Sequence, residues 1–145
     1  MKKKIAILGS TGSIGKSTLE IIKKINKFEV KLLLTNKNFI EITKQIKIFK
    51  PYVVIIINKD VYSKVKKKYP NKKFVLLNNI ENIQRYIKKI DITVSAIPGI
   101  AGLKPTILVG DSLLLRKSYL SSSSIISFFN KSNAWSDIIG LFFSW

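Results

Sequence analysis

The start of the sequence places three evenly spaced glycines between an apolar run and a helical pattern. The run Lys4–Leu8 is short, apolar and β-branched, which predicts a buried parallel strand that ends at Gly9. The spacing G-x-x-G-x-x-G continues through Gly12 and Gly15. The helix predicted next has its expected inner face at Ile14, Thr18, Ile22 and Ile25. A strand, a glycine loop and a helix in this order are typical of the first part of a βαβ unit.

Each of these glycines has a predicted task in binding a dinucleotide. Gly9 allows a tight turn out of the strand, Gly12 lets the backbone approach a pyrophosphate, and Gly15 lets the helix pack closely on the sheet. The free N–H groups at the start of the helix, and its positive dipole end, attract phosphate. The usual fingerprint is G-x-G-x-x-G, so a turn that needs glycines for its geometry alone stays open as an alternative.

Strand-like and helix-like stretches alternate as far as Ala96. Further strands are predicted over 29–34, 52–57, 73–77 and 92–96, and further helices over 39–49, 59–69 and 80–89. Such alternation implies right-handed crossovers between parallel strands. The predicted fold class is therefore α/β, a doubly wound, Rossmann-like parallel sheet with helices on both faces, over residues 1–106.

Residues 107–145 do not continue this pattern. From residue 101 onward there are only six charged side chains and no glutamate, and residues 121–124 are all serine. Aromatic residues crowd the end, without a clean helical or strand period. We expect this irregular segment to be a degraded or frameshifted tail, so that the chain is a truncated form of a longer protein.

The composition is strongly basic, with 26 Lys and Arg against 8 Asp and Glu, for a net charge of +18. Such a charge favours nucleic acid or an anionic membrane as a partner. Only Arg85 and Arg116 are arginine, which leaves 24 lysines, whereas nucleic-acid contacts more often use Arg. Because Lys, Asn, Ile, Tyr and Phe share A- and T-rich codons, we interpret most of the charge as genomic composition drift. A basic nucleic-acid-binding domain stays open as an alternative.

The residue types that are absent exclude several kinds of site. The sequence has no Cys and no His, which excludes disulfides, thiolate or His-ligated metal sites, Cys nucleophiles and a Ser-His-Asp triad. The apolar run Ile5–Leu8 is too short for the core of a signal peptide. No stretch of about 18 apolar residues predicts a membrane-spanning helix. We therefore expect a cytoplasmic protein with no membrane partner.

The end of the second predicted strand favours one nicotinamide cofactor over the other. An NAD site usually has an acid there for the ribose 2′-hydroxyl, but this sequence reads Thr35-Asn36-Lys37-Asn38. A cation and short polar side chains suit a 2′-phosphate, so NADPH is predicted rather than NADH. The alternative is that Lys37 is one of many lysines in an ordinary exposed turn.

A second nucleotide motif overlaps the glycine loop. Gly15-Lys16-Ser17 resembles the end of the P-loop G-x-x-x-x-G-K-[ST], but the first glycine of that pattern would fall at Ser10. Asp60 and Asp91 are poor candidates for the acidic magnesium partner, because each lies at the edge of a strand toward the next element. A P-loop-like nucleotide hydrolase stays open as an alternative.

Two motifs together resemble the 1-deoxy-D-xylulose 5-phosphate reductoisomerase family. Residues 4–15, followed by Ser17-Thr18-Leu19, look like the start of that family, and residues 96–106 resemble its A-I-x-G-x-A-G-L-x-P-T stretch. The pair Lys37-Asn38 lies where the family has its K-N pair. The resemblance covers about residues 3–106.

The resemblance implies an NADPH-dependent oxidoreductase of non-mevalonate isoprenoid biosynthesis. Its members convert 1-deoxy-D-xylulose 5-phosphate, a phosphorylated sugar, to 2-C-methyl-D-erythritol 4-phosphate, with hydride from NADPH and with Mg²⁺ or Mn²⁺ holding the substrate. They are homodimers. Together with the glycine pattern, the resemblance places the cofactor-binding residues at Gly9, Thr11, Gly12, Ser13, Ile14, Gly15, Lys37 and Asn38.

The resemblance ends after Thr106. Residues 110–120 look like a shortened version of the family's A-N-K-E-S-L motif without its Asn and Glu, and the acidic metal cluster has no counterpart. Asp111 and Asp137 are the only acids in the tail, whereas Mg²⁺ normally requires carboxylate ligands. We therefore assign no catalytic residue and no metal ligand, and expect no reductoisomerase activity from this chain alone.

Overall fold

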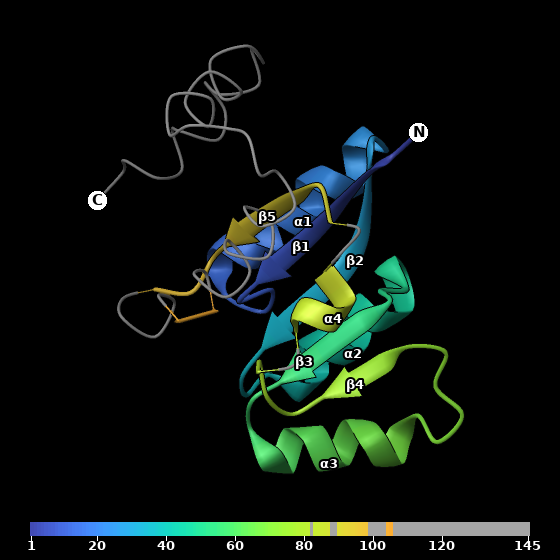
Figure 1. Ribbon diagram of the computed structural model, residues 1–145, viewed down its shortest axis with the longest axis vertical. Coiled ribbons are helices and arrows are strands. Elements are labelled where there is room, and N and C mark those ends of the chain that lie inside the picture. Colours follow the sequence, from blue (N-terminus) through green and yellow to red (C-terminus); the bar gives the residue numbers. More distant parts are fainter. Residues whose placement is uncertain (82, 88–89, 99–103, 106–145) are drawn as a thin grey trace. The chain divides into compact units, whose positions relative to one another are not determined.

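The computed structural model describes residues 1–81, 83–87, 90–98 and 104–105, all within Met1–Leu113, the first of two units of the chain. In this part, a parallel five-stranded sheet has the order β4-β3-β2-β1-β5 (Figure 1). The strands are β1 (Lys3–Leu8), β2 (Phe28–Thr35), β3 (Val53–Ile56), β4 (Val75–Leu77) and β5 (Ile92–Ser95). The helices are α1 (Ser13–Ile25), α2 (Phe39–Phe49), α3 (Lys59–Lys68) and α4 (Gln84–Ile87). The predicted tail, with its boundary after residue 106, lies outside the described residues and stays a prediction.

The order of the strands creates a switch in direction beside β1. The strands β2, β3 and β4 each lie next to the strand that precedes them in the sequence. The chain then returns and places β5 on the other side of β1. Right-handed crossovers therefore put the first three helices on one face and the returning segment on the other. The predicted α/β class with a parallel, Rossmann-like sheet is confirmed. In such sheets, ligands bind at the carboxyl ends of the strands where the order reverses.

Each face of the sheet has its own apolar core. One core buries side chains of α1, α2 and α3 against the sheet: Leu19, Ile22, Ile42, Ile46, Val61 and Val65. The other buries the segment around α4 against the opposite face, through Ile80, Ile83 and Ile90. Because β1 and β3 are covered on both faces, alternation of polar and apolar residues is lost and they read as continuous apolar runs.

The predicted inner face of the first helix is wrong in part. Ile22 is buried, but Ile14 and Ile25 are 37% and 44% exposed. The buried residues of α1 are Gly15, Leu19 and Ile22, which are spaced by four and then three. Gly15 fits against the backbone of the glycine loop, and this contact sets the rotation of the helix about its axis.

The helix predicted over 80–89 begins later than expected. In the described residues its regular part, α4, covers Gln84–Ile87, and residues 88–89 lie outside them. Just before α4, Ile83 N donates to Ile80 O at 3.1 Å, and at its start Tyr86 N donates to Ile83 O at 2.9 Å. Hydrogen bonds between residues three apart form tighter turns than those of an α-helix. The other predicted strands and helices are confirmed, with small differences at their ends. None of the described helices has the length and apolarity needed to cross a membrane.

Candidate functional site

The glycine loop lies at the carboxyl end of β1, between the ends of β2 and β5. On one side, Leu34 O of β2 accepts hydrogen bonds from Gly9 N and Ser10 N, both at 2.9 Å. On the other side, Ala96 N donates to Leu8 O at 2.7 Å, directly after β5. The loop is therefore fixed at the point where the strand order reverses, which is the expected ligand position in this fold.

Gly9 and Gly15 are required by the protein's own backbone. Gly9 has φ of 83°, and a Cβ atom there would lie 2.7 Å from Ala96 O. A Cβ atom on Gly15 would lie 2.3 Å from Gly9 O and 2.7 Å from Ser10 Cα. The tight turn and the close packing of the helix are thus both present, as the spacing of the glycines indicates.

Gly12 differs from the other two glycines. Its backbone, with φ of −74° and ψ of 172°, is a conformation that any residue adopts. A Cβ atom there would lie 3.4 Å from Gly9 O and 3.9 Å from Ala96 O, which are ordinary van der Waals contacts. The fold therefore does not itself require glycine at this exposed position, and without a side chain the backbone here is open.

The first turn of α1 presents donors without a side-chain cap. Gly12 is the N-cap and has no side chain, and the first turn holds no acid. The first intrahelical bond joins Lys16 N to Gly12 O at 2.9 Å, so the N–H groups of Ser13, Ile14 and Gly15 have no carbonyl within the helix. Exposed donors at the positive end of a helix dipole suit a phosphate group.

Lys37 and Asn38 follow β2, so they share the edge of the sheet at which the glycine loop lies. Both side chains are exposed. Asn38 Oδ1 accepts a hydrogen bond from Glu41 N at 3.0 Å and so caps α2. This capping role was not predicted; an Asn three residues before an acid at a helix start is its signal. The carboxamide NH₂ of Asn38 and the Lys37 ammonium are the donors available here for an anion.

A buried polar network beneath the loop was also not predicted. The hydroxyl oxygens of Thr11 and Thr35 lie 2.6 Å apart and share a hydrogen bond, which joins the loop to the end of β2. Gln45 of α2 is only 2% exposed, and its Nε2 donates to Ser10 O at 2.9 Å. The same nitrogen donates to Glu41 Oε1 at 3.2 Å. The glycine loop is thus held by side chains from both β2 and α2.

The described residues do not provide a metal site. Among them, no group of three or more Asp, Glu, His or Cys side chains could hold a metal ion. Asp91 lies at the opposite edge of the sheet from the loop, where its Oδ2 accepts from Lys4 N at 2.8 Å. Asp60 lies in the first turn of α3, which follows β3. In the sheet, β2 lies between β3 and β1, so Asp60 is not next to the strand that leads into the glycine loop. Neither acid is placed to hold magnesium at the glycine loop, as a P-loop would need.

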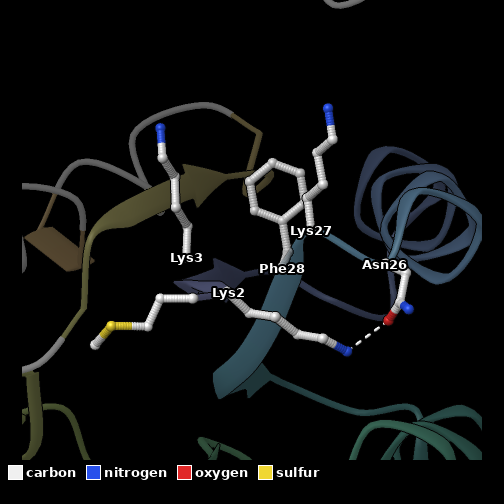
Figure 2. Close-up of a pocket in the computed structure, with 6 residues that line it drawn as sticks. Lys2, Lys3, Asn26, Lys27 and Phe28 are labelled. Carbon is white, nitrogen blue, oxygen red and sulfur yellow. Dashed lines mark hydrogen bonds between the residues drawn. The ribbon is translucent and has the colours of Figure 1, made fainter.

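An open pocket lies at the other edge of the sheet, where β1 and β2 begin (Figure 2). It is lined by Met1, Lys2, Lys3, Asn26, Lys27 and Phe28. In Figure 2, Lys2 Nζ donates a hydrogen bond to Asn26 Oδ1. Because the glycine loop follows the carboxyl end of β1, this pocket is separated from it by the length of the strand and is not part of the candidate site at the loop.

Comparison with known proteins identifies the family of the chain. The family model described as 1-deoxy-D-xylulose 5-phosphate reductoisomerase matches residues 5–112. The chain belongs to this reductoisomerase family. The reductoisomerase of Pelagibacter ubique (strain HTCC1062) is 42% identical over 109 residues, which cover 72% of this chain and 28% of the relative. That of Buchnera aphidicola subsp. Schizaphis graminum (strain Sg) is 42% identical over 121 residues, covering 78% of this chain and 30% of the relative.

Solved reductoisomerase structures have the same fold. The enzyme from Zymomonas mobilis in complex with NADPH has a TM-score of 0.68 at 25% identity, over 77% of this chain and 30% of that one. A reductoisomerase in complex with NADPH, fosmidomycin and magnesium has a TM-score of 0.67 at 28% identity, over 76% and 28% of the two chains. The family resemblance is confirmed, and the chain spans less than a third of the length of these relatives.

Proposed function

We propose that residues 1–106 of this chain form the NADPH-binding domain of a 1-deoxy-D-xylulose 5-phosphate reductoisomerase. One observation carries the proposal: an open glycine loop and an uncapped helix start lie at the switch point of the sheet. The segment after the neighbouring strand β2 carries Lys37 rather than an acid, which favours a 2′-phosphate over a free 2′-hydroxyl. Members of the family are known in complex with NADPH, which supports the choice of cofactor.

Each predicted cofactor-binding residue has a role in this proposal. The backbone N–H groups of Ser13 and Ile14 bind the pyrophosphate, over the open backbone at Gly12. Lys37 Nζ and the carboxamide NH₂ of Asn38 bind the 2′-phosphate. Gly9, Thr11 and Gly15 shape the loop through their contacts with Ala96, Thr35 and the loop backbone. Bound NADPH supplies a hydride; the described residues bind and orient it.

For the whole protein we propose conversion of 1-deoxy-D-xylulose 5-phosphate to 2-C-methyl-D-erythritol 4-phosphate, in the cytoplasm and as a homodimer. A divalent metal, Mg²⁺ or Mn²⁺, is proposed to hold the substrate, in keeping with magnesium in a related complex. Because the described residues offer no ligand set for it, we derive no step through the metal and assign no catalytic residue.

Titration of the purified 145-residue chain with four ligands tests the proposal. We expect NADPH to bind, by fluorescence or calorimetry, at least about tenfold more tightly than NADH. ATP with Mg²⁺ binding more tightly than NADPH would instead favour the P-loop alternative. Duplex DNA or RNA binding that falls steeply with salt, without a preference for NADPH, would favour the nucleic-acid alternative.

An activity assay tests the expectation that this chain alone does not complete the reaction. With Mg²⁺ or Mn²⁺, 1-deoxy-D-xylulose 5-phosphate and NADPH supplied, we expect no NADPH consumption above the rate without protein, since the described part lacks a metal-ligand group. Steady turnover that scales with the concentration of this chain would contradict the expectation. NADPH binding, measured on the same sample, shows that the domain is folded and competent to bind.

A further inference from the structure

A single buried side chain, Gln45, joins the two parts of the proposed NADPH site. Its Nε2 donates to Ser10 O in the glycine loop at 2.9 Å and to Glu41 Oε1 in the first turn of α2 at 3.2 Å. Glu41 N in turn donates to Asn38 Oδ1 at 3.0 Å. Hydrogen bonds therefore run from the pyrophosphate side of the site to the side proposed for the 2′-phosphate, which includes Lys37.

Glu41 is the acid nearest in sequence to Lys37, and it is only half-buried. An acid at the end of the second strand is the usual mark of an NAD site, because a carboxylate repels a 2′-phosphate and accepts from a 2′-hydroxyl. Glu41 lies four residues further along, at the start of α2, and its carboxylate is bonded to Gln45. That bond directs the carboxylate along α2 toward Gln45, rather than leaving it free to turn toward Lys37.

Gln45 is a polar side chain in an almost fully buried position. It is only 2% exposed, and its Oε1 has no hydrogen-bond partner in the described part of the chain, which disfavours folding. Its Nε2 supplies the donor for Ser10 O, and Ser10 is fully buried. A carboxamide at this position is therefore explained by what its NH₂ group holds in place.

We infer that Gln45 is a positioning residue for cofactor specificity, which fixes the glycine loop and restrains the Glu41 carboxylate from the 2′-phosphate. The inference rests on the proposed NADPH function. The two hydrogen bonds of Gln45 have different expected effects on binding. Loss of the bond to Ser10 weakens binding of NADPH and NADH alike, because both carry the pyrophosphate. Release of the Glu41 carboxylate weakens NADPH alone, because NADH has no 2′-phosphate.

A double-mutant cycle on the full chain distinguishes these effects, with Gln45→Met and Glu41→Gln as the two changes. Met has a similar volume and no donor, and Gln at 41 keeps an oxygen acceptor for Gln45 but has no charge. In Gln45→Met we expect the ratio of NADPH to NADH affinity to fall about tenfold. Glu41→Gln alone should leave the ratio within about twofold of the wild type, because the carboxylate is already restrained.

The double variant is the decisive measurement. Adding Glu41→Gln to Gln45→Met should restore the NADPH to NADH ratio, although both affinities stay lower than in the wild type. A structural role for Gln45 alone would leave the ratio unchanged in every variant, and that result overturns the inference. An equal rise in the ratio from Glu41→Gln in both backgrounds also overturns it, because Gln45 would then not restrain the carboxylate. Absence of NADPH binding in the wild type would refute the proposed function instead, so the two failures are distinct.

Discussion

The three glycines of the loop make the sharpest test, because the structure gives each a different physical reason. Replacing Gly12 or Gly15 by Ala adds one methyl group in each case, at positions three residues apart. At Gly15 the added Cβ meets Gly9 O at 2.3 Å, so the backbone itself must move. At Gly12 the nearest protein atom is Gly9 O at 3.4 Å, so nothing in the fold opposes the methyl group. The same substitution should therefore affect stability at one position and ligand binding at the other.

The expected effects on stability differ in size. Overpacking costs about 1–3 kcal/mol, and the contact of the new Cβ with a backbone oxygen places Gly15→Ala at the upper end. The gain in helix propensity offsets about 1 kcal/mol, which leaves a net loss of about 2 kcal/mol. For a domain of about 100 residues this lowers the midpoint of thermal unfolding by roughly 10 °C. Gly12→Ala gains about 0.4–1 kcal/mol from the unfolded state and loses about 0.5–1 kcal/mol at the N-cap, where Ala is less favourable than Gly, so we expect almost no change.

The expected effects on binding follow the opposite order. A methyl group at Gly12 keeps the pyrophosphate from the N–H groups of Ser13 and Ile14, and a charge-assisted hydrogen bond contributes about 1.5–3 kcal/mol. We expect Gly12→Ala to weaken NADPH binding at least about thirtyfold, equivalent to about 2 kcal/mol. Gly15→Ala should lose NADPH affinity only to the extent that the domain is unfolded.

Two measurements on each variant check this reasoning: thermal unfolding followed by circular dichroism, and NADPH titration well below both unfolding midpoints. Wild-type affinity in Gly12→Ala would refute the role of Gly12 in ligand approach. Early unfolding of Gly12→Ala would show that this glycine is structural as well. A wild-type midpoint for Gly15→Ala would show that the loop and α1 separate easily, against the contact at 2.3 Å.

Three further predictions concern single side chains. Lys37→Met should weaken NADPH binding about tenfold and change NADH binding only slightly, while Lys59→Met, at the start of the next helix, should change both only slightly in a ligand titration. Asn38→Ala and Asn58→Ala should each cost about 1 kcal/mol of stability by chemical denaturation, because both residues cap helices, but only the former should weaken NADPH. Burial raises the pKa of Tyr69 above its ordinary value of 10.0, so its contribution is complete below pH 10 and is lost as pH rises through the folded-state pKa. When the free energy of unfolding is measured from pH 8 to 11, it should therefore fall less steeply with pH in Tyr69→Phe than in the wild type.

The elements of the sheet were predictable because burial on both faces leaves a simple pattern. β3 is fully buried along its length and reads as an unbroken apolar run. The glycine loop was predictable in part because close backbone contacts require glycine at Gly9 and Gly15. The rotation of α1 was not, because Ile14 and Ile25 are as apolar as Ile22. The buried face of α1 combines Leu19 and Ile22 with the contact of Gly15 and the loop, and that contact joins backbone atoms and leaves no hydrophobic signal.

The polar contacts of the candidate site were harder to predict for a different reason. Thr11 and Thr35 share a hydrogen bond across 24 positions of sequence, and nothing in either segment identifies its partner. Gln45 lies between the buried Ile42 and Ile46 on α2, where a polar residue resembles an ordinary interruption of an apolar face. An amide on the buried side of a helix beside a glycine loop is the signal that indicates such a contact, since a buried amide needs a partner.

The net charge of +18 adds a general attraction for anions to every binding measurement on this chain. Any anion is attracted to such a surface, and NADPH carries more negative charge than NADH, so a preference for NADPH also includes attraction to lysines outside the site. Removing any one lysine lowers this general attraction by a similar small amount, whereas removing a lysine that contacts the 2′-phosphate also removes a short-range bond. Lys37 and Lys59 both lie on the carboxyl side of strands, at the starts of neighbouring helices, and both are exposed. Comparing the NADPH affinities of the Lys37→Met and Lys59→Met variants therefore removes the general attraction and leaves the contribution of the site. High salt screens exposed charges, so only a difference in affinity that persists at high salt assigns the 2′-phosphate to Lys37.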